Sequence, residues 1–232
     1  MQIELLVFDL DGTLVDSKLD LALAVNATRA DLQLPPLPHE IVFSYVGNGA
    51  PTLIRRALGE GFSEEQLQRS LEFFLGYYRL HMLDNTKPYT GVPQALDRML
   101  AAGLRLAVLT NKPVRFSRDL LRGLRLGDHF RAVYGGNSFE TKKPHPEGLQ
   151  KVMAELSAGP EQTLVVGDSS VDVRAARNAG AWACGVTYGF QPETFADDPP
   201  DLLVDSLEEL AEFVTSRPTL FGLSFSAPPP PG

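Results

Sequence analysis

Residues 5–17 read LLVFDLDGTLVDS, and this stretch decides the fold. The apolar run Ile3–Phe8 predicts a buried strand. The strand is followed by two carboxylates, Asp9 and Asp11, with only a leucine between them. Like charges at close range repel each other, so a pair of acids at the end of a core strand needs a compensating partner. A turn after the strand would need only one aspartate, so the pair favours a functional site.

From residue 89 onward, short apolar runs alternate with amphipathic helical patterns. This alternation is typical of an α/β fold in which helices cover both faces of a parallel sheet. We therefore predict a doubly wound, mainly parallel, Rossmann-like sheet with Ile3–Phe8 as its first strand. The further predicted strands are Leu104–Leu109, Phe130–Tyr134, Thr163–Val166, Trp182–Val186 and Leu202–Val204.

Residues 18–88 break this rhythm, because their apolar residues recur every three or four positions and no strand pattern is visible. Ser63 and Gln66 form a capping-box signature ahead of the longest of these helical patterns, which runs to Met82. The other helical patterns lie around Leu19–Leu32, Ile41–Val46 and Pro51–Leu58. The segment is therefore expected to be an all-helical cap domain inserted after the first strand.

The domain division follows from these patterns. Residues 1–17 and 89–216 are expected to form the catalytic core, and residues 18–88 the helical cap. Residues 217–232 end in SAPPPPG, and four consecutive prolines cannot join a helix or a central strand. We expect this last segment to be an extended, mobile tail.

Composition narrows the class of protein. The chain has 232 residues and a formal net charge of −8, which argues against nucleic acid as a partner. No apolar run approaches the length of a membrane span, so no membrane partner is expected. The single cysteine, Cys184, excludes internal disulfides and favours a reducing, cytoplasmic location. The sequence leaves the oligomeric state open.

Polar residues follow three further strands at the point where each ends or shortly after it. Thr110, Asn111 and Lys112 come after the second strand, and Lys142 and Lys143 stand in TKKPHPEGL after the third. The segment GDSSVD, which contains Asp168 and Asp172, comes after the fourth. Ligands of open α/β sheets bind at the carboxyl ends of the strands, so these groups are expected to converge. Carboxylates with a hydroxyl and an amine suit Mg²⁺ and phosphoryl transfer.

Taken together, LLVFDLDGTLVDS, VLTNKP, KKPHP and GDSSVDV resemble the four motifs of the haloacid dehalogenase superfamily of phosphatases. Motif order and spacing match over residues 3–205. The place of the helical insert resembles the subgroup with a mobile helical cap. Within that subgroup, SYVGNGAPTLIRRAL and TNKP are most similar to the phosphoglycolate phosphatases. The resemblance implies a small phosphorylated metabolite as the partner.

The resemblance also implies catalytic roles. Asp9 would be the nucleophile that forms an aspartyl-phosphate, and Asp11 the general acid and base. Thr110 and Lys143 would stabilise the transferring phosphoryl group. Lys143 is preferred to Lys142 because it stands directly before the proline.

Metal and substrate contacts complete the implied site. Mg²⁺ would be held by Asp9, by the backbone carbonyl of Asp11 and by Asp168, with Asp172 further out. The expected substrate-binding residues are Gly12, Thr13, Asn111, Lys112, and in the cap Asn48 and Arg56. The plainer interpretations are a helix cap for Asp168, a solvated lysine pair and a solvated Arg56.

Other functions remain open at this point. A phosphosugar mutase, or a broad-specificity sugar phosphatase or pyrophosphatase, would use the same acids. A dehalogenase releases halide and would not need the acid at Asp11. A non-enzymatic binding module would be expected to lack a carboxylate or the lysine, and here the set is complete.

Overall fold

The computed structural model describes residues 3–216, so the predicted tail at 217–232 lies outside the described residues. Its centre is a six-stranded sheet with the order β5-β4-β1-β6-β7-β8, in which every pair of neighbours is parallel. The predicted sheet is confirmed, and each predicted strand is found within two residues of its expected bounds. The strands are β1 (Leu5–Phe8), β4 (Arg105–Leu109), β5 (Ala132–Tyr134), β6 (Thr163–Gly167), β7 (Trp182–Val186) and β8 (Leu202–Val204).

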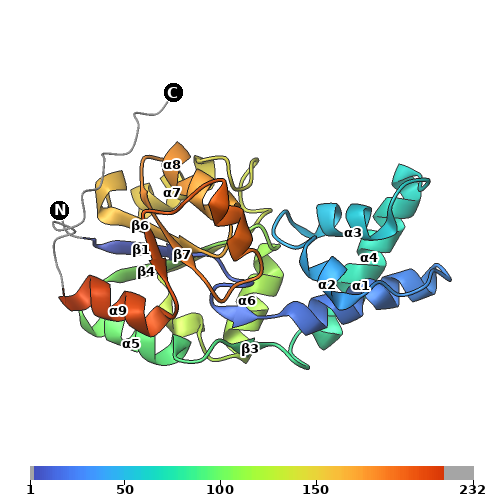
Figure 1. The fold of residues 1–232 in the computed structure, drawn as a ribbon, viewed down its shortest axis with the longest axis horizontal. Helices are drawn as coiled ribbons and strands as arrows, with labels where there is room; N and C mark the ends of the chain where they lie inside the picture. Colours follow the sequence, from blue (N-terminus) through green and yellow to red (C-terminus); the bar gives the residue numbers. More distant parts are fainter. Residues whose placement is uncertain (1–2, 217–232) are drawn as a thin grey trace.

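Side chains of β1 alternate between two hydrophobic clusters, as the period of a strand requires. Leu5 and Val7 pack with residues of α7 and α8, whereas Leu6 and Phe8 pack with residues of α5, α6 and α9. Figure 1 shows α5 and α9 on one side of the sheet and α7 and α8 on the other. The continuous apolar run of β1 is therefore explained by burial on both faces. The helices are α5 (Val92–Ala101), α6 (Val114–Gly123), α7 (Glu147–Glu155), α8 (Ser170–Asn178) and α9 (Leu207–Ser216).

The strand order creates a switch point at the middle of the sheet. From β1 the chain moves outward to β4 and β5, and it then returns to β6 on the other side of β1. Phe8 is paired with Val108 on one side and with Val166 on the other, so the three strands end side by side. The residues that follow these strands therefore share the crevice where ligands of doubly wound folds bind.

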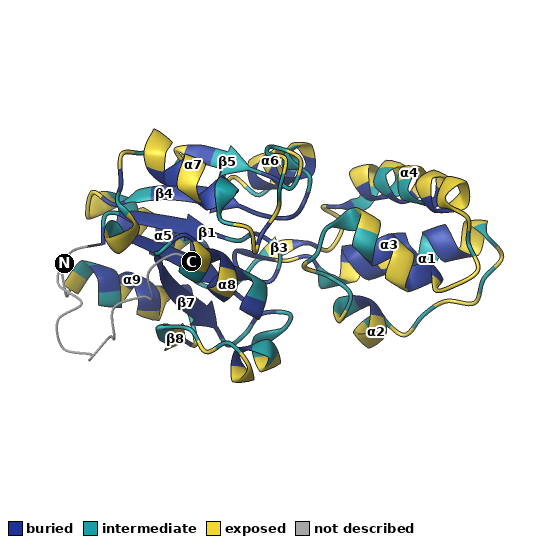
Figure 2. Cartoon of the chain, turned by 90° about the horizontal axis from the view of Figure 1, so that it is seen from above, coloured by how far each residue is buried: buried dark blue, intermediate teal, exposed yellow. Residues whose placement is uncertain are grey.

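The cap consists of α1 (Lys18–Asp31), α2 (His39–Phe43), α3 (Ala50–Leu58) and α4 (Glu64–His81). Figures 1 and 2 show these helices as a separate group beside the carboxyl ends of the sheet. The predicted capping box is present, since the Ser63 side chain accepts from the backbone of Gln66 and the Gln66 side chain accepts from Ser63. None of the described helices is long and apolar enough to cross a membrane.

Two very short strands connect the cap with the core. β2 (Val15–Asp16) pairs in an antiparallel manner with β3 (Lys87–Pro88), close to the ends of the inserted segment (Figure 1). This ribbon was not predicted, because two residues are too few to show an alternating pattern. The domain bounds at 17/18 and 88/89 stay a prediction.

Asp20 joins the segment that leads into the cap to the segment that returns from it. Its side chain is 1% exposed and lies in the first turn of α1. It accepts hydrogen bonds from the backbone and side chain of Asn85 and from the backbone and side chain of Thr86. Asn85 and Thr86 directly precede β3, so this carboxylate fixes the returning chain against the outgoing helix.

Replacement of Asp20 tests how much these hydrogen bonds stabilise the fold. We expect Asp20→Ala to lower the free energy of unfolding by about 3 kcal/mol, because buried donors that face a charged acceptor lose their partner. Asp31→Ala, an exposed change at the end of the same helix, is the control and should shift it by less than about 0.5 kcal/mol. Urea unfolding followed by circular dichroism measures both values. Equal values for the two variants would refute this stabilising role of Asp20.

Candidate active site

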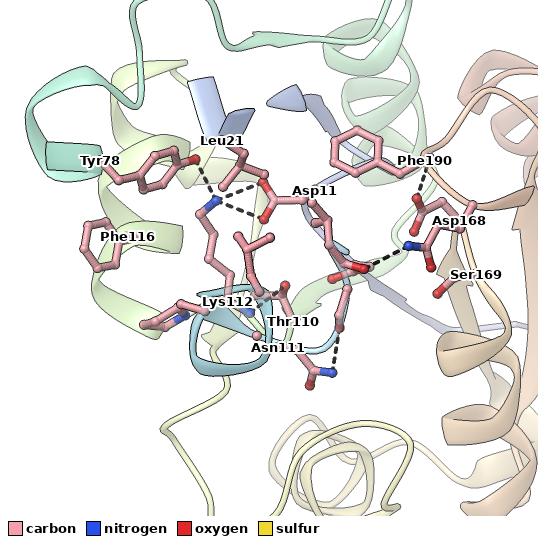
Figure 3. Close-up of a pocket in the computed structure, with 18 of the residues that line it drawn as sticks. Asp11, Leu21, Tyr78, Thr110, Asn111, Lys112, Phe116, Asp168, Ser169 and Phe190 are labelled. Atoms are coloured by element: carbon pink, nitrogen blue, oxygen red, sulfur yellow. Dashed lines mark hydrogen bonds and ion pairs between the residues drawn. The ribbon is translucent and has the colours of Figure 1, made fainter. Parts of the chain in front are cut away.

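A cavity separates the carboxyl ends of the strands from the cap. Its empty volume is about 670 Å³, open solvent at its mouth included. The core contributes a polar floor, whereas the cap contributes a mainly apolar wall (Figure 3). The floor includes Asp9, Asp11, Thr110, Lys112 and Asp168. The cap wall includes Leu21, Val46, Leu53, Phe74, Leu75 and Tyr78. A concave site with few convergent polar groups is typical of a small-molecule pocket.

Three carboxylates gather at the switch point. Asp9, Asp168 and Asp172 each offer an oxygen, and these oxygens lie within 4.8 Å of one another. Asp168 and Asp172 are buried, and burial raises the pKa of Asp168 well above its usual range, with the charges of Asp172 and Asp9 adding to the shift. Burial also raises the pKa of Asp172. The cluster is therefore short of positive charge.

Oxygen donors of this cluster fit a hard cation. Oδ1 of Asp9 is buried and accepts no hydrogen bond from the described residues, although Lys143 Nζ lies 3.0 Å from it. Oδ2 of Asp168 is fixed by the backbone N–H of Phe190 at 2.7 Å. Carboxylate oxygens without histidine or cysteine nearby suit Mg²⁺ better than Zn²⁺.

Lys143 provides the positive charge that the cluster does contain. Its Nζ lies 2.6 Å from Oδ1 of Asp172 and 3.0 Å from Oδ1 of Asp9. Burial lowers the pKa of this lysine, but the charges of Asp172 and Asp9 outweigh burial, and the pKa is raised. Lys143 is therefore an ammonium, while Lys142 is exposed to solvent. The structure thus brings the lysine before the proline to Asp9.

Asp11 lies apart from this cluster. Its carboxylate accepts two hydrogen bonds from Lys112 Nζ, at 3.0 and 2.9 Å, and one from the hydroxyl of Ser17. These donors hold it toward the cap, so its side chain is not among the grouped metal-binding oxygens. The expected ligand at this position, the backbone carbonyl, stays a prediction. Asp9 and Asp11 therefore avoid mutual repulsion by facing different lysines.

Gly12 and Thr13 follow Asp11 directly in the sequence, and both are buried. Gly12 has a φ of +86°, and a Cβ there would lie 2.1 Å from Oδ2 of Asp168. Only glycine permits this close approach. Thr13 is fully buried, and its hydroxyl has no partner among the described residues. Neither residue is among those that line the cavity.

The loop after β4 places Thr110 and Asn111. Thr110 lines the cavity, and its hydroxyl accepts a hydrogen bond from the backbone N–H of Lys112 at 3.3 Å. Asn111 donates to the carbonyls of Gly47 and Lys143 and accepts from the Lys143 backbone, each at 3.0 Å. Although Asn111 lines the cavity, its amide is occupied in joining the cap loop to the Lys143 loop.

The predicted cap contacts are not brought to the cavity. Asn48 is half-buried and does not line it, although Gly47 and Gly49 on either side do. Arg56 is exposed, and among the described residues its guanidinium donates only to the Tyr45 carbonyl, at 3.5 Å. The reason is the amphipathic pattern of α3, whose buried face is Leu53, Ile54, Ala57 and Leu58.

Sequence reasoning also missed residues that do face the cavity. Tyr78 is buried in the hydrophobic core and also lines the cavity, where its hydroxyl accepts a hydrogen bond from Lys112 Nζ. Phe190 positions Asp168 through a backbone N–H, which leaves no side-chain signal in the sequence. Helical periodicity identifies a buried ring but does not show where its hydroxyl ends.

Comparison with known proteins agrees with this geometry. The sequence model of the haloacid dehalogenase-like hydrolases matches residues 6–186, which is most of the chain. The chain belongs to this family. The match begins within β1 and ends with β7, so it includes the motifs at the ends of β1, β4 and β6.

Individual relatives of this hydrolase are similar over nearly its whole length. A phosphoglycolate phosphatase of Mannheimia succiniciproducens is 38% identical over 92% of this chain and 99% of its own. Phosphoglycolate phosphatase 1 of Pseudomonas aeruginosa is 40% identical over 89% of this chain and 78% of its own. The crystal structure of a predicted phosphoglycolate phosphatase from Haemophilus somnus superposes with a TM-score of 0.87 at 32% identity, over 92% and 98% of the two chains.

Adjacent lysines provide a matched test of the site. We expect Lys143→Met to reduce kcat for hydrolysis of a phosphomonoester by about 10²–10³-fold, the scale for loss of one preorganised donor. Lys142→Met should change kcat by less than about threefold, because Lys142 is exposed. Steady-state kinetics with p-nitrophenyl phosphate measures both, and circular dichroism checks that each variant is folded. An equal loss in both variants would contradict the assignment.

Proposed function

We propose that this hydrolase is a magnesium-dependent phosphomonoesterase that works through an aspartyl-phosphate on Asp9 and prefers phosphoglycolate. The observation that carries the proposal is the division of the two acids. Asp9 lies with Lys143, Asp168 and Asp172 at the switch point, whereas Asp11 lies with Lys112 on the side of the cap. One carboxylate thus faces the phosphate site and the other the leaving group.

The residues of this chain suit a two-step transfer. Asp9 attacks the phosphorus, the bond to the ester oxygen breaks, and Asp11 gives its proton to the departing alcohol. Asp11 then takes a proton from the water that attacks the aspartyl-phosphate, which releases phosphate and regenerates Asp9. Lys143 and Thr110 stabilise the oxygens of the phosphoryl group during both steps.

Mg²⁺ would be held by Asp9 and Asp168, with Asp172 behind them. When bound, it neutralises the charge of the phosphoryl group and of the carboxylates. The support is the geometry of the carboxylate cluster and the family to which the chain belongs.

Phosphoglycolate is supported by the leaving-group side of the cavity. Lys112 is the cation that lines it among the described residues, and a carboxylate two atoms from the phosphate ester is a small anion that can meet it. The relatives named as phosphoglycolate phosphatases point to the same substrate. The cap wall is mainly apolar, and among the described residues Tyr78 is its only polar side chain, which disfavours a phosphosugar mutase or a sugar phosphatase with several hydroxyls to bind.

Metal binding can be tested without turnover. We expect calorimetric titration of the wild type with Mg²⁺ to show one site, and Asp168→Asn to weaken its affinity at least tenfold, since a charged ligand is lost. Asp16→Asn, a change at an exposed carboxylate, should leave the affinity unchanged. Chelation of the metal should abolish hydrolysis by the wild type. Undiminished Mg²⁺ binding by Asp168→Asn would refute the assignment of the site.

Substrate preference tests the finer part of the proposal. The wild type should hydrolyse phosphoglycolate with a kcat/KM at least about 10- to 150-fold above that for ethyl phosphate, since each hydrogen bond to a charged group contributes a factor of that size. Lys112→Met should remove most of this preference, whereas Arg56→Ala should keep it. Asp9→Asn should abolish both activities. Pyrophosphate and glucose 6-phosphate are the alternative substrates, and a preference for either would reject phosphoglycolate.

A further inference from the structure

Tyr78 connects the cap with the catalytic floor. It lies on α4, is 2% exposed, and is one of the residues that line the cavity. Lys112 Nζ donates a hydrogen bond to this hydroxyl at 2.8 Å, and the same ammonium donates to both oxygens of Asp11 (Figure 3). A buried aromatic residue of the cap therefore contacts the cation that faces the leaving group.

Counting donors shows what the Tyr78 hydroxyl can still do. An ammonium has three protons, and Lys112 uses them on the two oxygens of Asp11 and on Tyr78. The Tyr78 oxygen is thus an acceptor, and its own proton remains to be donated. Within residues 3–216, no hydrogen bond uses this proton. A buried hydroxyl proton at the wall of a cavity is available to a ligand.

The ring and its protonation state make Tyr78 a well-defined donor. The ring stacks on Phe74 of the cap, with centroids 5.7 Å apart, and packs at 5.8 Å against Phe116 of the core. Burial raises the pKa of Tyr78 to about 12, so the hydroxyl keeps its proton at neutral pH. The hydroxyl is therefore held in one place before substrate arrives, which lowers the entropic cost of binding.

We propose that Tyr78 is a specificity-determining residue that donates its hydroxyl proton to the carboxylate of the substrate, beside Lys112. The proposal rests on the proposed function, and it identifies the cap donor that neither Asn48 nor Arg56 provides. The incoming carboxylate accepts a hydrogen bond from the hydroxyl of Tyr78. It accepts a second from Lys112 Nζ, through one of the two N–H groups that now donate to Asp11. Asp11 keeps the hydrogen bond from the other N–H group and the hydrogen bond from the hydroxyl of Ser17. The substrate's carboxylate thus bridges core and cap.

This role differs in its kinetics from a purely structural one. The carboxylate is remote from the reacting phosphorus, so Tyr78 binds it about equally in the ground state and in the transition state. Loss of such a contact raises KM and leaves kcat nearly unchanged. A structural defect in the cap would instead impair hydrolysis of every phosphomonoester.

The test is Tyr78→Phe, which keeps the ring and removes the hydroxyl. We expect kcat/KM for phosphoglycolate to fall about 10- to 150-fold, mainly through KM. With ethyl phosphate, which has no carboxylate, the fall should be less than about threefold. Tyr77→Phe is the matched control, because Tyr77 neighbours Tyr78 on α4 but does not line the cavity. It should leave both substrates unaffected.

The outcomes separate this inference from the proposed function. If the wild type prefers phosphoglycolate and Tyr78→Phe retains that preference, Tyr78 does not bind the carboxylate and only the present inference fails. If Tyr78→Phe loses activity equally on both substrates, the residue is structural and the inference also fails. If the wild type itself does not distinguish the two substrates, the preference for phosphoglycolate fails, and the inference with it.

Discussion

Repulsion among aspartates at the ends of β1 and β6 is the constraint on which the rest of the site depends. When ionised, Asp9, Asp11, Asp168 and Asp172 carry four negative charges, and the two buried lysines nearby, Lys112 and Lys143, return two positive ones. Buried charges are tolerated only when they are paired, so the excess of carboxylates favours a bound cation, and without one burial raises the pKa of Asp168 and of Asp172.

The same constraint explains how the lysines divide the site. Lys143 stands with Asp9 and Asp172, and Lys112 stands with Asp11, so each acid has its own electrostatic environment. Two carboxylates that are neighbours in the sequence can then take different chemical roles. The loop after β1 can approach Asp168 closely because residue 12 is a glycine, since a side chain at this position would collide with Asp168.

The cap and the core contribute different surfaces to the cavity. Its wall is mainly apolar, and it is tied to the core through a few polar contacts at the rim. Asn111 donates to the Gly47 carbonyl, and Gln191 donates to the carbonyls of Ser44 and Val46. These contacts involve backbone carbonyls of the cap, so cap side chains that face the cavity are free to differ without disturbing the phosphate site.

The sequence by itself determined the sheet, the helical cap and the groups at the strand ends. Strand periodicity and motif spacing are local, and parallel strands must bring their carboxyl ends to one edge. It could not decide which side-chain oxygens group together, and in the structure the side chain of Asp11 turns to Lys112 and not to the carboxylate cluster. It placed Arg56 at the substrate, whereas Arg56 is exposed, and it did not show that Tyr78, a buried core residue, also lines the cavity. Only tertiary structure decides such contacts, because they depend on how α3 and α4 pack against a core that is distant in the sequence.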